Sequence, residues 1–305
     1  HPARNDLLIA LATAPLAVAA IGRYGLKVAA MVAISVVVGL AVEVVAYKLR
    51  RRPVGALGYP AWILLALVLP PALPLWMVGV AAFFGAGIAI GYFGGHGRQL
   101  ASAVAVGWAF AALSFPTAFG FSWAYPFPGF LGGFTRWTAA LPTIDHPIEL
   151  LELRSPVAIV DVLLGAFPQS PANALPALTL AVGVILAALR AIDVRTSLSF
   201  IAATAALMAV GRLVAPQAVP PLVTLLVGDF PVAALLVLGD RRTSARTTAG
   251  RWVAGAMGGL VAFIVRGFSS FADGIFFAVL FTNTFSAIID EAVLRLRSRA
   301  AGARS

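Results

Sequence analysis

Apolar segments alternate with short polar connections along the whole chain. Breaking the sequence at charged residues and at Pro/Gly clusters leaves apolar segments at 7–22, 28–47, 56–69, 75–93, 100–118, 175–189, 198–214, 221–238, 251–268 and 274–292. Most approach the ~20 residues that a helix needs to cross a bilayer core, and the shorter ones suit half-helices inside a bundle. The pattern predicts an all-α polytopic membrane protein with about ten transmembrane helices.

The composition agrees with this prediction. Hydrophobic residues make up 61% of the 305 residues and charged residues only 11%, whereas soluble domains carry about 45–50% and about 25%. A soluble enzyme is therefore excluded. The chain has no cysteine and only three histidines, which are far apart, so neither a metal site nor an iron–sulfur site is predicted. No catalytic residue is predicted either.

Lysine and arginine gather in alternate connections, at residue 4, at 48–52, at 98, at 190–195, at 241–246 and at 295–304. With ten spans these connections share one side, and the positive-inside rule places that side and both termini in the cytoplasm. Arg23 and Lys27 are the exceptions. The net charge of +10 is then an orientation signal, and the expected surroundings are a lipid bilayer rather than nucleic acid.

The longest connection, 119–174, lies outside in this topology. It opens with the aromatic run FGFSWAYPFPGFLGGFTRW and ends with the apolar stretch 157–167. Its aromatic rings suit either a membrane interface or the stacking of a flavin or quinone. We interpret it as an interfacial or re-entrant cap; an ordinary external loop with one amphipathic helix is the alternative.

A faint repeat relates 91–113 to 237–260, because both pass from an apolar helix end through a basic, Gly-containing loop into a Gly/Ala-rich helix. Each copy lies near the end of a five-segment half. An odd number of spans gives the two halves opposite topology, as in inverted-repeat folds. We therefore expect a first half at 1–118, the external cap at 119–174, and a second half with a basic tail at 175–305.

Asp229 lies in the middle of the apolar segment 221–238, where a charge costs about 2.5–3.5 kcal/mol on insertion scales. Gly228 and Pro231 flank it and favour a helix broken near the midplane. Asp229 is a candidate for an ion or proton pathway, or for a structural pair with Arg212 or Arg266, which otherwise snorkel to the interface. Glu43, near Lys48, favours a local ion pair.

The connection 239–251 is rich in groups that bind anions, since hydroxyls, guanidinium groups and a following helix N-terminus can hold a phosphate or a flavin tail. Positive-inside charge alone also explains its arginines. The candidate cofactor-binding residues here are Asp240, Thr243, Ser244, Thr247, Thr248 and Arg251.

The stretch 239–290 resembles the D subunit of the Rnf electron-transport complex and the related B subunit of the Na⁺-translocating NADH:quinone reductase. The matching positions are Asp240, Thr243, Ser244, Thr247, Thr248, Gly250, Arg251, Arg266, Asp273, Gly274, Asn283, Ile289 and Asp290. The stretches 64–98 and 106–116 also look like the family's Leu-Pro-Pro turn, Gly-Gly loop and Ser-Phe-Pro helix. The resemblance covers most of the chain.

This resemblance implies a ten-helix fold of two inverted five-helix halves, similar to urea and ammonium channels. It also implies a bacterial inner-membrane subunit that supplies the scaffold and ion path of a redox-driven ion translocase. Such a subunit is not catalytic alone, and its membrane and peripheral partners carry flavin and Fe–S centres. The alternatives are a small-solute channel or transporter, or a cofactor-free scaffold.

The family attaches FMN to a threonine outside the membrane, so FMN or riboflavin is implied. The matching position holds Leu141, which has no hydroxyl, and covalent FMN is predicted to be absent there. Thr138 and Thr143 are the neighbouring candidate acceptors, and Trp137 is a candidate stacking residue. The family's later Gly-Glu element reads Ala172-Asn173.

Overall fold

The computed structural model describes residues 2–51, 58–93, 99–129, 132–138, 143–144, 158–214, 220–268 and 274–302. The part that precedes the predicted cap contains α1 (Pro2–Tyr24), α2 (Leu26–Leu49), α3 (Tyr59–Val68), α4 (Leu75–Ala86), the π-helix η1 (Gly87–Tyr92), α5 (Ala103–Ser114) and α6 (Pro116–Gly120). The cap contributes β1 (Trp123–Ala124), β2 (Thr143–Ile144), α8 (Ile159–Leu163) and the 3₁₀ turn η3 (Pro171–Asn173). The last part contains α9 (Pro176–Ala188), α10 (Val194–Val214), α11 (Pro221–Leu226), α12 (Phe230–Val232), the π-helix η4 (Ala233–Val237), α13 (Thr248–Phe268) and α14 (Ile275–Gly302).

Helices occupy all ten predicted apolar segments. Among the described residues, six helices are long and apolar enough to cross a membrane, and α3, α5 and α9 are apolar but shorter. The segment 221–238 is divided into α11, α12 and η4 rather than forming one helix. The predicted multi-pass, all-α membrane protein is therefore confirmed at this level.

Small residues let the long helices approach closely. A Cβ atom added at Gly255 of α13 would lie 2.4 Å from the carbonyl oxygen of Thr196, and one at Gly259 would lie 2.7 Å from that of Phe200. Both carbonyls belong to α10, so α10 and α13 pack with their backbones almost in contact. Membrane helices, which gain no hydrophobic driving force from lipid, commonly associate in this way.

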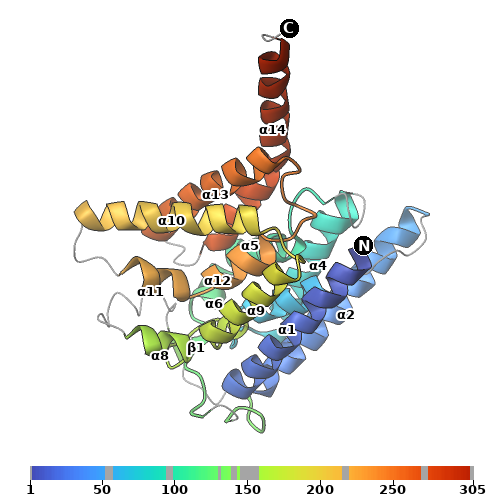
Figure 1. The fold of residues 1–305 in the computed structure, drawn as a ribbon. Coiled ribbons are helices and arrows are strands. Elements are labelled where there is room, and N and C mark those ends of the chain that lie inside the picture. The colour runs from blue at the N-terminus through green and yellow to red at the C-terminus, as the bar shows by residue number, and fades with distance from the viewer. Residues whose placement is uncertain are drawn as a thin grey trace.

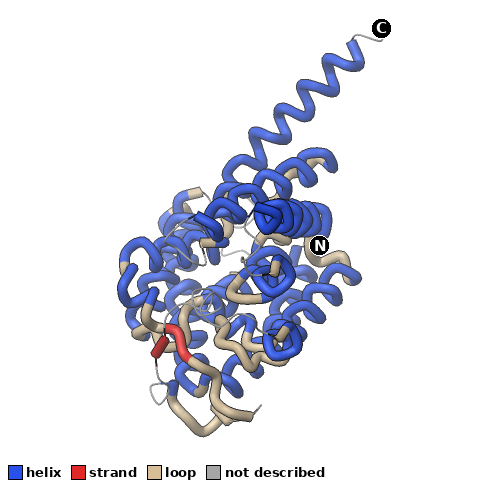
Figure 2. The backbone as a smooth tube through the Cα atoms, turned by 90° about the vertical axis from the view of Figure 1, so that its left-hand side faces the viewer, coloured by secondary structure: helices blue, strands red, loops and turns tan. Residues whose placement is uncertain are grey.

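The cap and the end of the chain lie at opposite ends of the bundle. The C-terminal part of α14 extends past the other helices, whereas β1, α8 and the adjoining loops lie at the far end (Figure 1). Figure 2 shows the same separation from the side. Strands β1 and β2 form a two-stranded antiparallel ladder with Trp123 opposite Ile144.

Backbone hydrogen bonds fasten the cap to the turn between α1 and α2. Leu26 N donates to Arg136 O at 2.8 Å, and Phe127 N donates to Arg23 O at 2.7 Å. The Arg23 guanidinium donates to the carbonyl oxygen of Gly165, and Lys27 Nζ donates to that of Ala72 at 2.6 Å. The two cations that depart from the predicted charge pattern therefore bind backbone carbonyls of the protein.

Glu43 of α2 holds the start of α3. The side chain is fully buried, and its carboxylate accepts hydrogen bonds from Gly58 N at 3.0 Å and from Trp62 Nε1 at 2.8 Å. Lys48, the partner that the sequence favoured, is exposed one turn further along. A carboxylate in an apolar bundle is stabilised by such donors, and these contacts place the N-terminus of α3 against α2.

Candidate functional site

The apolar segment 221–238 is broken at its middle. Helix α11 ends at Leu226, Val227 is extended, and Gly228 takes the left-handed φ of +72° that a residue with a side chain rarely adopts. Asp229 follows as the residue that precedes α12, and its side chain is fully buried. The break predicted from Gly228 and Pro231 is thus present, and it places a carboxylate inside the bundle.

Two amides from the cap hold this break. Asn173 Nδ2 donates to Leu226 O at 2.9 Å and to Gly228 O at 2.8 Å. Gln169 Oε1 accepts from Gly228 N at 2.7 Å. Both amide side chains are fully buried. The three hydrogen bonds satisfy backbone groups that the interrupted helix cannot pair internally, so the cap segment fixes the geometry around Asp229.

Tyr24, at the end of α1, completes this buried cluster. Its hydroxyl donates to Gln169 O at 2.7 Å and accepts from Gln169 N at 2.9 Å. The Asp229 carboxylate also acts electrostatically on this hydroxyl. Residues from α1, the cap and the broken segment, separated by more than 50 positions in sequence, therefore meet at one place.

Arg266 of α13 reaches the same break from another side. It is 8% exposed, and it donates to Thr224 O at 2.6 Å and to Val227 O at 2.8 Å. Its guanidinium carbon lies 5.4 Å from the centre of the Phe230 ring. Arg212 is instead exposed in the last turn of α10. Of the predicted ion-pathway residues, the structure brings Asp229 and Arg266 to one region and leaves Arg212 at the surface.

The connection 239–251 binds an anion, and that anion is a side chain of the same protein. The Asp290 carboxylate of α14 accepts from the backbone N–H groups of Arg246 and Thr247 and from the Thr247 hydroxyl. Thr247 Oγ1 in turn accepts from Gly250 N at 3.0 Å, which caps α13. The N-terminal end of α13, the predicted phosphate site, thus already holds a carboxylate.

Four other candidate residues of this connection also make internal contacts. Thr243 Oγ1 and Ser244 Oγ donate to Asp240 O, and Arg251 Nε lies 3.5 Å from Asp193 Oδ2. Thr248 is exposed at the start of α13. Their role in binding a cofactor stays a prediction.

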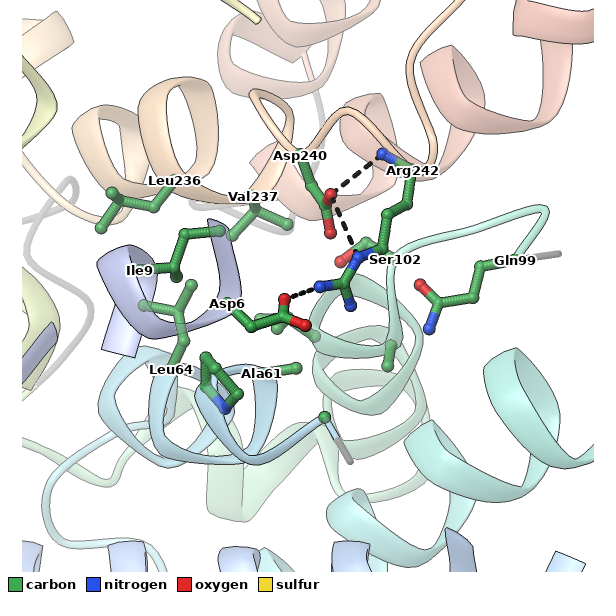
Figure 3. Close-up of a pocket in the computed structure, with 14 residues that line it drawn as sticks. Asp6, Ile9, Ala61, Leu64, Gln99, Ser102, Leu236, Val237, Asp240 and Arg242 are labelled. Atoms are coloured by element: carbon green, nitrogen blue, oxygen red, sulfur yellow. Dashed lines mark hydrogen bonds and ion pairs between the residues drawn. The ribbon is translucent and has the colours of Figure 1, made fainter. Parts of the chain in front are cut away.

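A cleft lies beside this connection, between α1, α3 and α5 on one side and η4 on the other (Figure 3). Arg242 crosses it to form an ion pair with Asp6 of α1, and its backbone N–H donates to Asp240 Oδ1 at 3.0 Å. Nearby, Ser102 N donates to Asn283 Oδ1 of α14 at 3.0 Å. These contacts join helices from the two ends of the sequence.

The cap residues test whether a flavin fits as the resemblance implies. Thr138 is fully buried, and its hydroxyl donates to the carbonyl oxygen of Tyr24. An oxygen held in this way cannot carry a phosphodiester-linked flavin on the outer surface, so Thr138 does not fit the acceptor role. Thr143 lies in β2, Trp137 is 45% exposed, and Leu141 lies outside the described residues.

Sequence patterns did not identify three of the residues that build the break. Tyr24, Gln169 and Asn173 occur at a helix end and in a Pro-rich connection, where periodicity carries no signal. Asn173 was visible only as a departure from the resembled motif. One sequence feature could have pointed to this site: Gln169 and Asn173 lie four positions apart in a turn that contains prolines.

Comparisons with known proteins agree over nearly the whole chain. The model of the NQR2, RnfD, RnfE family matches residues 3–298. A curated relative from Escherichia fergusonii, named as the D subunit of the ion-translocating oxidoreductase complex, is 26% identical over 322 aligned residues, covering 94% of this chain and 91% of the relative. Proteins of the same name from Escherichia coli and Shigella boydii are 28% identical with the same coverage.

Proposed function

Because the chain belongs to the NQR2, RnfD, RnfE family, we propose that it is a membrane subunit of an ion-translocating oxidoreductase complex and that the ion passes the break at Asp229. The other subunits of the complex supply the redox chemistry. The chain itself contributes the membrane scaffold and the ion path.

The observation that carries the ion path is a buried carboxylate at a helix interruption. A charge at membrane depth is unfavourable by about 2.5–3.5 kcal/mol, so carboxylates found there commonly mark ion and proton pathways. Interrupted helices form the ion sites of many transporters. Asp229 combines full burial with the left-handed turn at Gly228. Arg266, which binds the carbonyls of Thr224 and Val227, brings a positive charge to the same break.

The proposed architecture is a pair of inverted five-helix halves, 1–118 and 175–305, joined by the external cap at 119–174. Helix α2 packs on α4 as α10 packs on α13, and α4 packs on α5 as α13 packs on α14. The third segment of each half is also irregular, since α3 is short and the α11–α12 segment is broken. Equivalent packing in opposite halves supports an inverted repeat.

The proposed setting is the bacterial inner membrane with both termini in the cytoplasm, which the placement of lysine and arginine supports. The proposed partners are membrane and peripheral subunits that carry flavin and Fe–S centres. Any flavin on this subunit is proposed to be held without a covalent bond, because Leu141 lacks a hydroxyl and the Thr138 hydroxyl is buried.

The test is Asp229→Asn in the intact complex, purified and reconstituted in vesicles. We expect electron transfer to continue at a comparable rate. The membrane voltage that electron transfer generates should fall at least tenfold, because the neutral amide has no negative charge with which to bind the ion. The matched control is Asp161→Asn in α8, whose carboxylate is exposed rather than buried, and it should keep the voltage. A full voltage in Asp229→Asn contradicts the proposed path.

A structural role for Asp229 gives a different result. If its carboxylate serves only to balance Arg266, Asp229→Asn should reduce the amount of assembled complex, and the double variant with Arg266→Gln should restore both assembly and voltage. Recovery of voltage in the double variant also contradicts the path.

A further inference from the structure

We propose that the ion carried at the break is a proton, which reaches Asp229 through a water molecule held between Gln169 and Asn173. This inference rests on the proposed ion path. It adds the identity of the ion and the residues that deliver it.

Each of the two buried amides at the break has one polar atom without a hydrogen-bond partner among the described residues. These atoms are Gln169 Nε2 and Asn173 Oδ1. The opposite end of each amide is already committed to the broken segment, because Gln169 Oε1 binds Gly228 N and Asn173 Nδ2 binds two carbonyls. The amide orientations are therefore fixed. Unsatisfied buried polar atoms of both kinds are matched by a water molecule, which accepts from one and donates to the other.

The same contacts make the break a poor site for a metal cation. Interrupted helices bind Na⁺ through unwound backbone carbonyls. Here those carbonyls already accept hydrogen bonds from positively polarised side-chain groups. Asn173 Nδ2 occupies the oxygens of Leu226 and Gly228, and the Arg266 guanidinium occupies those of Thr224 and Val227.

A metal ion placed there would face an amide donor, a guanidinium group and the orphaned N–H of Gln169 at once. A proton needs no shell of oxygen ligands and is compatible with each of these groups. The donor set around the break therefore favours a proton over Na⁺.

The charged and titratable groups around Asp229 are few. Tyr24 and Arg23 lie at the end of α1, where the Tyr24 hydroxyl binds Gln169, and Arg266 of α13 binds the carbonyl of Val227. The other elements that pack on α12, namely α9, η3, α11 and η4, contain no Asp, Glu, His, Lys, Arg or Tyr. These four elements therefore bring no second acid or base to Asp229.

In the proposed step the bridging water donates a proton to a carboxylate oxygen of Asp229, forming a carboxyl group. At the same time the bridging water takes up a proton from a hydronium ion on the side of the cap, so that no hydroxide is left behind. Loss of the carboxyl proton toward the other side of the membrane then returns Asp229 to its charged form beside Arg266. One proton enters and one leaves in each cycle, and no bond other than O–H changes.

The experiment uses the reconstituted complex in Na⁺-free buffer, with a pH-sensitive dye inside the vesicles. We expect electron transfer to change the pH inside the vesicles without Na⁺, and a protonophore should abolish this change. In Asp229→Asn the pH change should be at least tenfold smaller. Gln169→Met removes the donor to the water and the contact to Gly228, whereas Gln169→Glu keeps an oxygen for Gly228 N, replaces the donor with an oxygen and adds a carboxyl group. Both variants should slow proton transfer, and Asp229→Glu, which restores a titratable group, should recover part of it.

Each alternative result has a defined meaning. An absolute requirement for Na⁺, with Asp229→Asn raising the Na⁺ concentration needed, overturns the proton inference and leaves the ion path standing. Proton transfer that persists at the wild-type rate in both Gln169 variants overturns the role of the water. Full charge movement in Asp229→Asn with either ion overturns the proposed path itself.

Discussion

The hydroxyl of Thr138 is buried against the Tyr24 carbonyl, and this contact keeps its oxygen away from the outer surface. We predict that the denatured subunit has the bare mass of its polypeptide, because Leu141 has no hydroxyl and the Thr138 hydroxyl is buried. Intact-mass spectrometry checks this, and flavin recovered in the supernatant would indicate non-covalent binding. A mass increase equal to one FMN, mapped to Thr143, would show that the acceptor lies further along the chain.

At the scale of single elements, the close contact between α10 and α13 is the most sensitive packing feature. Gly255→Val would place three carbon atoms where the Thr196 carbonyl oxygen already lies 2.4 Å from the Cβ position. We expect destabilisation of about 1–3 kcal/mol from overpacking, seen as a lower melting temperature in detergent. Gly267→Ala on the same helix is the control, since nothing lies within 4 Å of its Cβ position. Equal melting temperatures for the two variants would contradict the packing.

The positions of the helices and of the break can be predicted from the sequence, but the contacts that hold the break cannot. Hydrophobic segments locate the helices because membrane burial depends on local composition, and Gly228 with Pro231 predicts the break because their backbone limits are local too. The hydrogen bonds from Gln169 and Asn173 to the broken segment join residues more than 50 positions apart, and no local sequence pattern encodes such contacts. For the same reason the sequence favours a nearby cation as the partner of Glu43, although its donors come from the start of α3.

At the scale of the whole molecule, the orientation in the membrane can be tested directly because the chain has no cysteine. We predict that a membrane-impermeant maleimide labels Phe121→Cys in intact cells and labels Ser298→Cys only after permeabilisation. Both positions are exposed, and they lie in the α6–β1 connection and in α14, toward opposite ends of the bundle. Labelling of Ser298→Cys alone in intact cells would invert the proposed topology.

The projecting end of α14 has a consequence for how deeply the protein lies in the bilayer. Its 28 residues, at about 1.5 Å each, span about 42 Å, which exceeds the ~30 Å hydrocarbon core by about two turns. Arg295, Arg297 and Arg299 lie on those turns, all exposed. Sliding the protein toward the cap would draw these guanidinium groups into hydrocarbon at about 2.5–3.5 kcal/mol each. The basic end of α14 therefore limits how far the protein can move along the bilayer normal. It also determines the depth at which the Asp229 carboxylate lies between the two aqueous phases.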